Sequence, residues 1–337
     1  MVKPRRVRAI ICKQMGDASL LELGEIESER LASDEVRVRV QRAGVNFPDT
    51  LIIKGQYQLK PPLPFAPGFE VAGEIIEVGE GAGEWRVGDR VMGLTSSGYG
   101  AFAEEAAVRR HGLVRVPEGV DLSKAMALLT AYGTSYHALV QRGALRPGEQ
   151  LVVLGASGSV GLAAVELGKA LGARVIAVGR SEERLKLAAA KGADVLLSYE
   201  NPAFKQNILG ATNGKGADVC MDMLGGKAFD TMARAMNWNA RLLVVGFTSG
   251  TIPLLPANLV LLKGYQLVGV WWSEFIKRMP EANQANFDEL FSLYAEGRID
   301  PHIGGQFPLS GVPEALTRLL DRSTTGKLII NLDDACV

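Results

Sequence analysis

The chain has 337 residues, of which 47% are hydrophobic and 22% charged, the composition of an ordinary globular protein. Because 37 basic residues balance 37 acidic ones, nothing in the net charge suggests a nucleic-acid or an anionic-membrane partner. The cysteines, Cys12, Cys220 and Cys336, are too far apart for a disulfide framework or a close metal cluster. No apolar run reaches the roughly 20 residues of a membrane helix. We therefore expect a cytoplasmic protein, and its length predicts two domains.

The first part of the chain, to about Pro117, is rich in strand signals. Residues 36–40 alternate apolar and charged side chains, the period of a half-buried strand, and further strands are expected at 71–78 and 90–94. Residues 60–68 contain too many prolines for a helix or a central strand and predict an extended loop.

The second part alternates short apolar strands with helices. Strands are expected at 151–154, 175–178, 195–197, 219–223 and 242–247, and helices at 160–171, 182–191 and 227–237. Apolar strands separated by helices predict a parallel, doubly wound α/β sheet. The tail, with a helix at 282–296 and a strand at 327–332, is too short to fold alone, so we expect it to pack on the first domain.

A glycine-rich turn follows the first of these strands. In the dinucleotide-binding pattern G-x-G-x-x-G, the second glycine admits a pyrophosphate and the third lets helix and strand pack closely. Gly158 and Gly161 fill those places, while Ala156 stands where the first glycine would be. A tight turn without a ligand is the alternative, but the βαβ context favours a dinucleotide at the helix N-terminus. The expected phosphate site comprises Ala156, Ser157, Gly158, Ser159, Val160 and Gly161.

The end of the next strand distinguishes between cofactors. NAD-binding proteins place an acidic residue there for the ribose 2′-hydroxyl. Here Gly179 leaves room, and Arg180, Ser181 and Arg184 offer positive charge and donors to a 2′-phosphate. The arginines could instead be solvated beside the acidic residues 182–183. The missing acid favours NADPH.

Four segments in this order, 43–49, 62–70, 132–139 and 155–161, resemble the zeta-crystallin-like quinone oxidoreductases of the medium-chain dehydrogenase/reductase superfamily. The similarity runs over nearly the whole chain. It implies a GroES-like β-rich catalytic domain, residues 1–128 and 272–337, that holds the substrate. It also implies an inserted Rossmann domain, residues 129–271, that holds NADPH, with a cleft between the two.

The resemblance also bears on metals. The superfamily's alcohol dehydrogenases hold catalytic zinc with a cysteine where this chain has Asn46 and a histidine where it has Phe69. Their structural zinc needs a cysteine quartet that is missing from residues 95–111. Amide and phenyl groups cannot replace thiolate and imidazole, so we expect no metal site.

Site residues follow from the same resemblance. Asn46 matches the family's pocket asparagine, Tyr57 its pocket tyrosine, and Thr134 the threonine whose hydroxyl lies near the nicotinamide. Structural roles are the alternatives: hydrogen bonds from Asn46 to the local backbone of its turn, and coverage of the proline-rich loop by Tyr57. The remaining matches are Gly246 and Phe247 over the nicotinamide, and Arg184 and Tyr199 beside the 2′-phosphate.

The expected function is zinc-independent hydride transfer from NADPH to a quinone-like acceptor. Asn46 would donate to the developing oxyanion, and Tyr57 would donate a hydrogen bond or relay a proton. One alternative is an NADPH-dependent 2-enal, enone or enoyl-thioester reductase, which must also protonate a carbon. Another, from a different class, is a non-catalytic NADPH-binding protein, crystallin-like or RNA-binding, although zero net charge disfavours RNA.

Two tryptophans, Trp271 and Trp272, end the apolar run 267–270. They could line the substrate pocket or belong to a sheet edge. Because an unpaired apolar edge invites pairing, we expect a homodimer through the Rossmann sheet edge.

Overall fold

The computed structural model of the protein describes residues 5–28 and 30–333. The chain separates into two compact units. Unit 1 contains Met1–Thr130, Ile276–Gln284 and Ile303–Val337, and unit 2 contains Ala131–Phe275 and Ala285–His302. Each unit has its own hydrophobic core.

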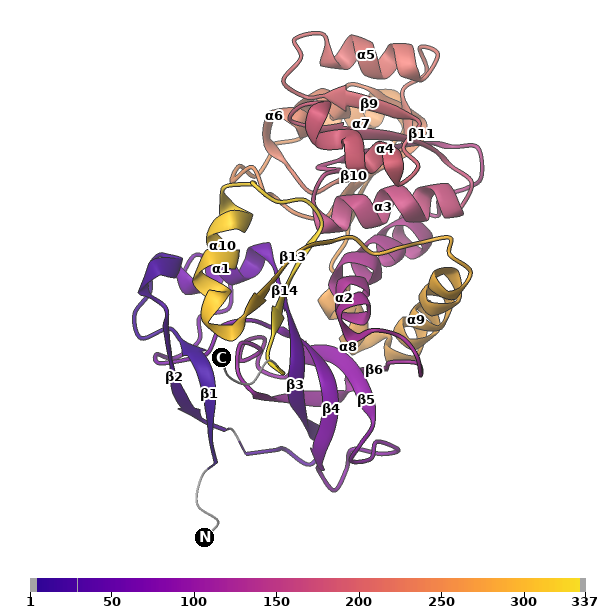
Figure 1. Ribbon diagram of the computed structural model, residues 1–337. Helices are drawn as coiled ribbons and strands as arrows, with labels where there is room; N and C mark the ends of the chain where they lie inside the picture. The colour runs from indigo at the N-terminus through magenta and orange to yellow at the C-terminus, as the bar shows by residue number, and fades with distance from the viewer. Residues whose placement is uncertain (1–4, 29, 334–337) are drawn as a thin grey trace. The chain divides into compact units, whose positions relative to one another are not determined.

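Unit 1 is built on strands (Figure 1). Its six-stranded sheet has the order β13-β14-β3-β4-β5-β6, and β3 also pairs with β6, which closes four of the strands on themselves. A separate pair is formed by β1 and β2. The strands are β1 (Arg6–Ile11), β2 (Glu22–Glu27), β3 (Glu35–Val45), β4 (Glu70–Val78), β5 (Arg90–Thr95), β6 (Glu105–Arg115), β13 (Ile303–Pro308) and β14 (Lys327–Asn331).

Alternation along β3 explains the core of unit 1. Val36, Val38 and Val40 are all buried, as the pattern predicts, and the strand continues beyond the expected end at residue 40 to Val45. The helical segments that pack near it are η1 (Ala18–Leu20), α1 (Phe47–Ile53), η4 (Leu309–Gly311) and α10 (Val312–Leu320). The proline-rich residues 60–68 contain no helix, as expected.

Unit 2 is a parallel sheet with the order β12-β11-β10-β7-β8-β9. This is the strand order of a doubly wound dinucleotide-binding fold. The strands are β7 (Gln150–Leu154), β8 (Arg174–Gly179), β9 (Val195–Ser198), β10 (Ala217–Asp222), β11 (Met236–Val244) and β12 (Gln266–Gly269). The α/β fold expected from the alternating strands and helices is confirmed.

Helices connect the strands of unit 2, and α3 and α5 are visible beside the sheet in Figure 1. They are a π-helical turn (His137–Arg142), α3 (Ser159–Ala170), η3 (Glu183–Leu185), α4 (Lys186–Ala190), α5 (Phe204–Ala211), α6 (Gly226–Ala233) and α7 (Ala257–Lys263). Three helices contribute residues to both units: α2 (Leu122–Tyr136), α8 (Trp272–Arg278) and α9 (Pro280–Ala295).

Two expected elements of unit 2 end well before the residue expected from the sequence. The helix expected at 227–237 stops at Ala233, because residues from Met236 onward pair with β10 as the start of β11. The strand expected at 242–247 ends at Val244, because the amides of Val245 and Gly246 turn to donate to the carbonyl of Asp222.

Among the described residues, no helix combines the length and the apolar character that crossing a membrane requires.

Candidate active site

The turn after β7 is made by a glycine that the sequence pattern did not single out. Gly155 has a φ of 86°, which favours glycine, and its amide and that of Ala156 donate to the carbonyl of Val178 at 2.9 and 3.1 Å. The side chain of Ala156 is fully buried. Gly155 therefore performs the tight-turn role, one residue before the position where the pattern places its first glycine.

The other two glycines of the turn have different surroundings. A Cβ added at Gly161 would overlap the carbonyl oxygen of Gly155 and lie 2.7 Å from the Cα of Ala156. A Cβ at Gly158 would have nothing nearer than 3.6 Å, and Gly158 is exposed. Gly161 thus permits the close approach of α3 to the turn, while Gly158 presents open backbone to a ligand, which fits a dinucleotide pyrophosphate.

The N-terminus of α3 lies directly after Gly158. The first amides of a helix have no intrahelical acceptor, so those of Ser159 and Val160 are suited to phosphate oxygens. The Ser135 hydroxyl donates to the Val160 carbonyl at 2.9 Å and ties α2 to this first turn. Sequence reasoning missed Ser135, since nothing in the linear pattern indicates this contact.

The expected 2′-phosphate residues lie at and after the end of β8. A Cβ at Gly179 would lie 2.9 Å from Leu185 Cδ2, so the absence of a side chain there also serves the packing of Leu185. Arg180 is exposed, and its Nε lies 4.0 Å from Glu200 Oε1. The amide of Tyr199 donates to the carbonyl of Gly179 at 3.0 Å, which brings Tyr199 to this strand end.

Two further expected residues, Ser181 and Arg184, lie close by in the chain, half-buried, with Arg184 in η3. Glu200 was not anticipated, because it follows the next strand, β9. The end of β8 therefore presents the exposed charge of Arg180 with the Glu200 carboxylate nearby.

Gly246 and Phe247 belong to a loop fastened to the end of β10. The Asp222 carbonyl accepts from the amides of Val245 and Gly246 at 2.9 and 3.3 Å. The Asp222 carboxylate accepts from Leu224 at 2.8 Å and Gly225 at 3.1 Å, and burial raises its pKa to about 6. One buried aspartate thus holds two loops at the carboxyl ends of β10 and β11, where α/β sheets bind ligands. Sequence reasoning missed Asp222.

The third catalytic candidate, Thr134, is buried in α2. The preceding residue, Gly133, admits the Trp272 ring, since a Cβ there would lie 2.7 Å from Trp272 Cε2. The two tryptophans therefore have different environments. Trp272 is buried against α2, while Trp271, after the edge strand β12, is 58% exposed.

Asn46 and Tyr57 lie in unit 1. Asn46 follows β3 at the start of α1 and is 9% exposed. Its Nδ2 donates to Glu70 Oε2 at 2.5 Å, and its Oδ1 accepts from Lys327 Nζ at 2.8 Å. Its carboxamide is thus held by two side chains, and Asn46 also forms the capping box at the start of α1. Tyr57 is half-buried against the core of unit 1.

Asp49 completes this buried group. Its Oδ2 accepts from the Asn46 amide at 2.8 Å, whereas its Oδ1 has no hydrogen-bond partner. Burial, reinforced by the negative charge of Glu70 and opposed by this hydrogen bond and by Lys327, raises the Asp49 pKa to about 8. Asp49 therefore keeps its proton at neutral pH.

Replacing Asp49 with asparagine is expected to remove one source of pH-dependent stability. The Asp49 carboxyl ionises at about pH 4 in the unfolded protein and at about pH 8 in the folded protein. Between these two values, the folded protein therefore binds one proton more than the unfolded protein. Wild-type stability from this group therefore falls by about 1.4 kcal/mol per pH unit as the pH rises through that window. Urea unfolding of both proteins should show that, as the pH rises through this window, the free energy of unfolding of Asp49→Asn increases relative to that of wild type.

The matched control is Asp230→Asn, at an exposed position on α6. Its stability curve should run parallel to that of wild type. Parallel curves for Asp49→Asn as well would contradict the raised pKa of Asp49.

Metal ligands were not expected, and within residues 5–28 and 30–333 no group of three or more histidine, cysteine, aspartate or glutamate side chains could hold a metal ion.

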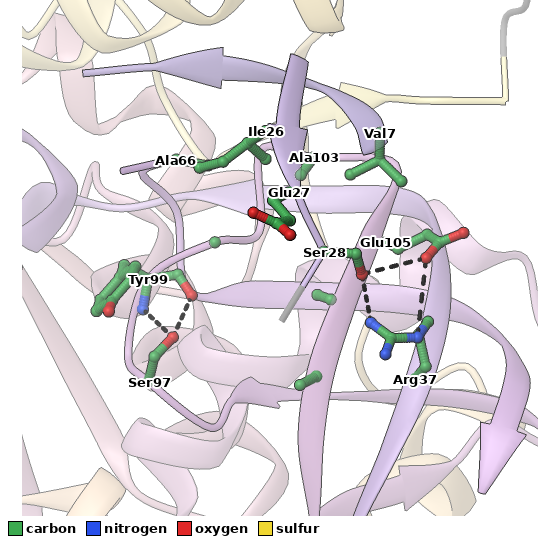
Figure 2. Close-up of a pocket in the computed structure, with 13 residues that line it drawn as sticks. Val7, Ile26, Glu27, Ser28, Arg37, Ala66, Ser97, Tyr99, Ala103 and Glu105 are labelled. Atoms are coloured by element: carbon green, nitrogen blue, oxygen red, sulfur yellow. Dashed lines mark hydrogen bonds and ion pairs between the residues drawn. The ribbon is translucent and has the colours of Figure 1, made fainter. Parts of the chain in front are cut away.

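A separate hollow of about 60 Å³ lies in unit 1 beside Val7, Ser28 and Arg37 (Figure 2). Arg37 there pairs with Glu77 at 2.7 Å and Glu105 at 3.8 Å. None of the expected site residues lines this hollow.

Two protein-family models match the chain. The alcohol dehydrogenase GroES-like domain matches residues 32–118, and the zinc-binding dehydrogenase family matches residues 159–288. The chain is 36% identical to quinone oxidoreductase-like protein 2 homolog of Nematostella vectensis over 96% of this chain and 88% of that protein. It is 31% identical to human quinone oxidoreductase over 97% of this chain and 98% of that protein.

Solved structures agree. The quinone oxidoreductase of Pseudomonas syringae pv. Tomato DC3000 superposes with a TM-score of 0.90 at 28% identity, over 97% of this chain and 100% of that one. A mycobacterial protein complexed with NADPH superposes with a TM-score of 0.89 at 28% identity, over 96% and 100%. The chain therefore belongs to the quinone oxidoreductase family of the medium-chain dehydrogenase/reductase superfamily and is an oxidoreductase with an NAD(P)-binding fold.

Proposed function

We propose that this oxidoreductase reduces quinone-like acceptors with NADPH and without zinc. The observation that carries the proposal is the buried Asn46 carboxamide, which Glu70 and Lys327 hold in place. The family resemblance places Asn46 where the alcohol dehydrogenases have a cysteine zinc ligand. Relatives named as quinone oxidoreductases support the acceptor class, and the neighbour complexed with NADPH supports the cofactor.

The residues of unit 2 suit NADPH, which supplies a hydride when bound. The open backbone of Gly158 and the amides of Ser159 and Val160 would hold the pyrophosphate. Arg180 and Arg184 would hold the 2′-phosphate. The loop at Gly246, fixed by Asp222, would lie against the nicotinamide.

In unit 1, Asn46 would stabilise the product of hydride transfer. Hydride addition to a quinone leaves an oxyanion, and one N–H of the Asn46 carboxamide would donate to that oxygen. One proton then completes the hydroquinone, and it can come from water or through Tyr57. A neutral donor suffices because the hydroquinone anion is a stable species, whereas an enal also requires protonation of a carbon.

The acceptor is tested by comparing NADPH oxidation with 1,4-benzoquinone and with trans-2-hexenal, using chelator-treated protein. Turnover with the quinone, and little with the enal, is expected. Turnover confined to the enal would move the protein to the alkenal reductases. No turnover with either, in protein that binds NADPH, would favour a non-catalytic role.

Cofactor preference gives a second expected result. Arg184→Ala and Arg180→Ala should each raise the KM for NADPH by about tenfold, the effect of losing one charge-assisted phosphate contact. The KM for NADH should stay unchanged, because NADH lacks the 2′-phosphate. Steady-state kinetics with both cofactors checks this, and equal effects on NADH and NADPH would contradict the assignment.

We further propose a homodimer through the edge of the unit 2 sheet. Around the edge strand β12, large apolar side chains are exposed, at 46% for Leu267 and 58% for Trp271. On the neighbouring helix α7, Leu261 is 80% and Leu262 67% exposed. Light scattering should give twice the chain mass for wild type and the single-chain mass for Leu261→Asp/Leu267→Asp. An unchanged mass for that variant would place the interface elsewhere.

A further inference from the structure

A buried ion pair crosses β3 of unit 1 close to the C-terminal end of the strand. Glu70 begins β4 and Lys327 begins β14, and these two strands lie on opposite sides of β3. Their side chains meet nevertheless, at 0% and 2% exposure. They meet over Gly44, which pairs with Glu70 in the register of β3 and β4.

Gly44 makes this crossing possible. A Cβ at this position would overlap Glu70 Oε2 and lie 2.8 Å from both Lys327 Cε and Met126 Sδ. The φ of Gly44 is not positive, so its backbone does not demand glycine. The space above the strand is what requires the absence of a side chain.

The ion pair holds the Asn46 carboxamide at both ends. Lys327 Nζ donates to Asn46 Oδ1, and Glu70 Oε2 accepts from Asn46 Nδ2. Glu70 is itself fixed, because its Oε1 accepts from the backbone amide of Thr130 at 3.0 Å. Rotating the carboxamide by half a turn would place its oxygen on the carboxylate and its NH₂ on the ammonium, so a single orientation fits.

This orientation leaves one N–H of Nδ2 weakly engaged. Nδ2 has two hydrogens; one points to Glu70, and the other has only the Gly44 carbonyl at 3.4 Å. That long contact is easily exchanged for a stronger acceptor.

We propose that Glu70 and Lys327, meeting over Gly44, are positioning residues that fix the Asn46 carboxamide so that its second N–H serves the acceptor oxygen. The inference rests on the proposed function, in which Asn46 contacts the acceptor. Neither residue needs to touch the acceptor itself.

The first test is Gly44→Ala, which keeps every charge but displaces the Glu70 carboxylate. We expect kcat with 1,4-benzoquinone to fall about ten- to a hundredfold, because a misplaced donor loses most of its effect. The dissociation constant for NADPH should be unchanged, since the predicted cofactor residues belong to unit 2. The control is Gly112→Ala in β6, where a Cβ has ordinary contacts no nearer than 3.5 Å, and it should behave as wild type.

The second test is the neutral double variant Glu70→Gln/Lys327→Met, which removes both charges without leaving one unpaired. It should fold and bind NADPH as wild type does, yet its kcat should be as low as that of Gly44→Ala. Wild-type kcat in this double variant would show that the pair does not position Asn46, and would overturn the inference.

A readout independent of turnover separates this inference from the proposed function. In protein labelled with ¹⁵N at asparagine side chains, the Asn46 NH₂ signals, identified by their loss in Asn46→Ser, should be shifted and slow to exchange in wild type. In Gly44→Ala they should move, while in Gly112→Ala they should not. Unmoved signals in Gly44→Ala would refute the orienting role even if quinone reduction is confirmed. Moved signals in a protein without quinone turnover would leave the orienting role standing and refute only the function.

Discussion

Gly161→Ala is expected to lower both stability and NADPH affinity, because its Cβ would overlap the Gly155 carbonyl at the point where α3 meets the turn. The overlap involves backbone atoms, which cannot rotate away as a side chain can. Forcing extra volume into such a contact costs about 1–3 kcal/mol. The same shift moves the amides of Ser159 and Val160, so NADPH affinity should fall at least about tenfold, or ~1.4 kcal/mol. Urea unfolding and fluorescence titration with NADPH measure the two effects.

Gly158→Ala is the matched variant that separates the effect on stability from the effect on NADPH affinity. Its Cβ would have nothing nearer than 3.6 Å, and its φ of −82° is ordinary. Stability should therefore stay within about 0.5 kcal/mol of wild type, while NADPH affinity falls because the methyl group occupies the approach of the pyrophosphate. Wild-type affinity in Gly158→Ala would place the phosphates elsewhere.

Lys327→Met is expected to destabilise the protein by about 3–5 kcal/mol, because it leaves the Glu70 carboxylate buried without its partner. Glu70 is 0% exposed and cannot turn to solvent. Removing both charges in Glu70→Gln/Lys327→Met should recover most of this loss, since neutral groups carry a smaller desolvation cost.

Denaturant unfolding of the single and double variants gives the comparison. An unchanged dependence on denaturant would show that the folded state is as compact as in wild type. A loss below about 1 kcal/mol in Lys327→Met would mean that water or another cation reaches Glu70, and would contradict the buried pair.

Most strands and helices could be predicted from the sequence, because the patterns that indicate them lie within short segments of the chain. The alternation in residues 36–40 marks a strand, and the apolar run 151–154 followed by glycines marks a strand before a helix. The end of β11 was not readable, because the chain bends there to reach the Asp222 carbonyl on a different strand. Similarly, Gly155 could be identified as the turn residue only from its φ of 86°.

The candidate site was predictable in its residue types but not in its connections. Asn46 was identified by resemblance, whereas its contact with Glu70 was not predicted. Lys327, the partner of Glu70, is 257 residues away in the sequence and is brought near by the pairing of β14 with β3. Such a contact depends on strand order and register, which one sequence does not contain.

The most direct test of the proposed function is NADPH oxidation with 1,4-benzoquinone by chelator-treated wild type and by Asn46→Ala. We expect turnover of wild type to survive chelation, and that of Asn46→Ala to fall by about a hundredfold, the effect of losing an oxyanion donor, with NADPH affinity unchanged. Wild-type turnover that disappears on chelation and returns with zinc would contradict metal-free reduction. Full turnover in Asn46→Ala would contradict the role of its carboxamide.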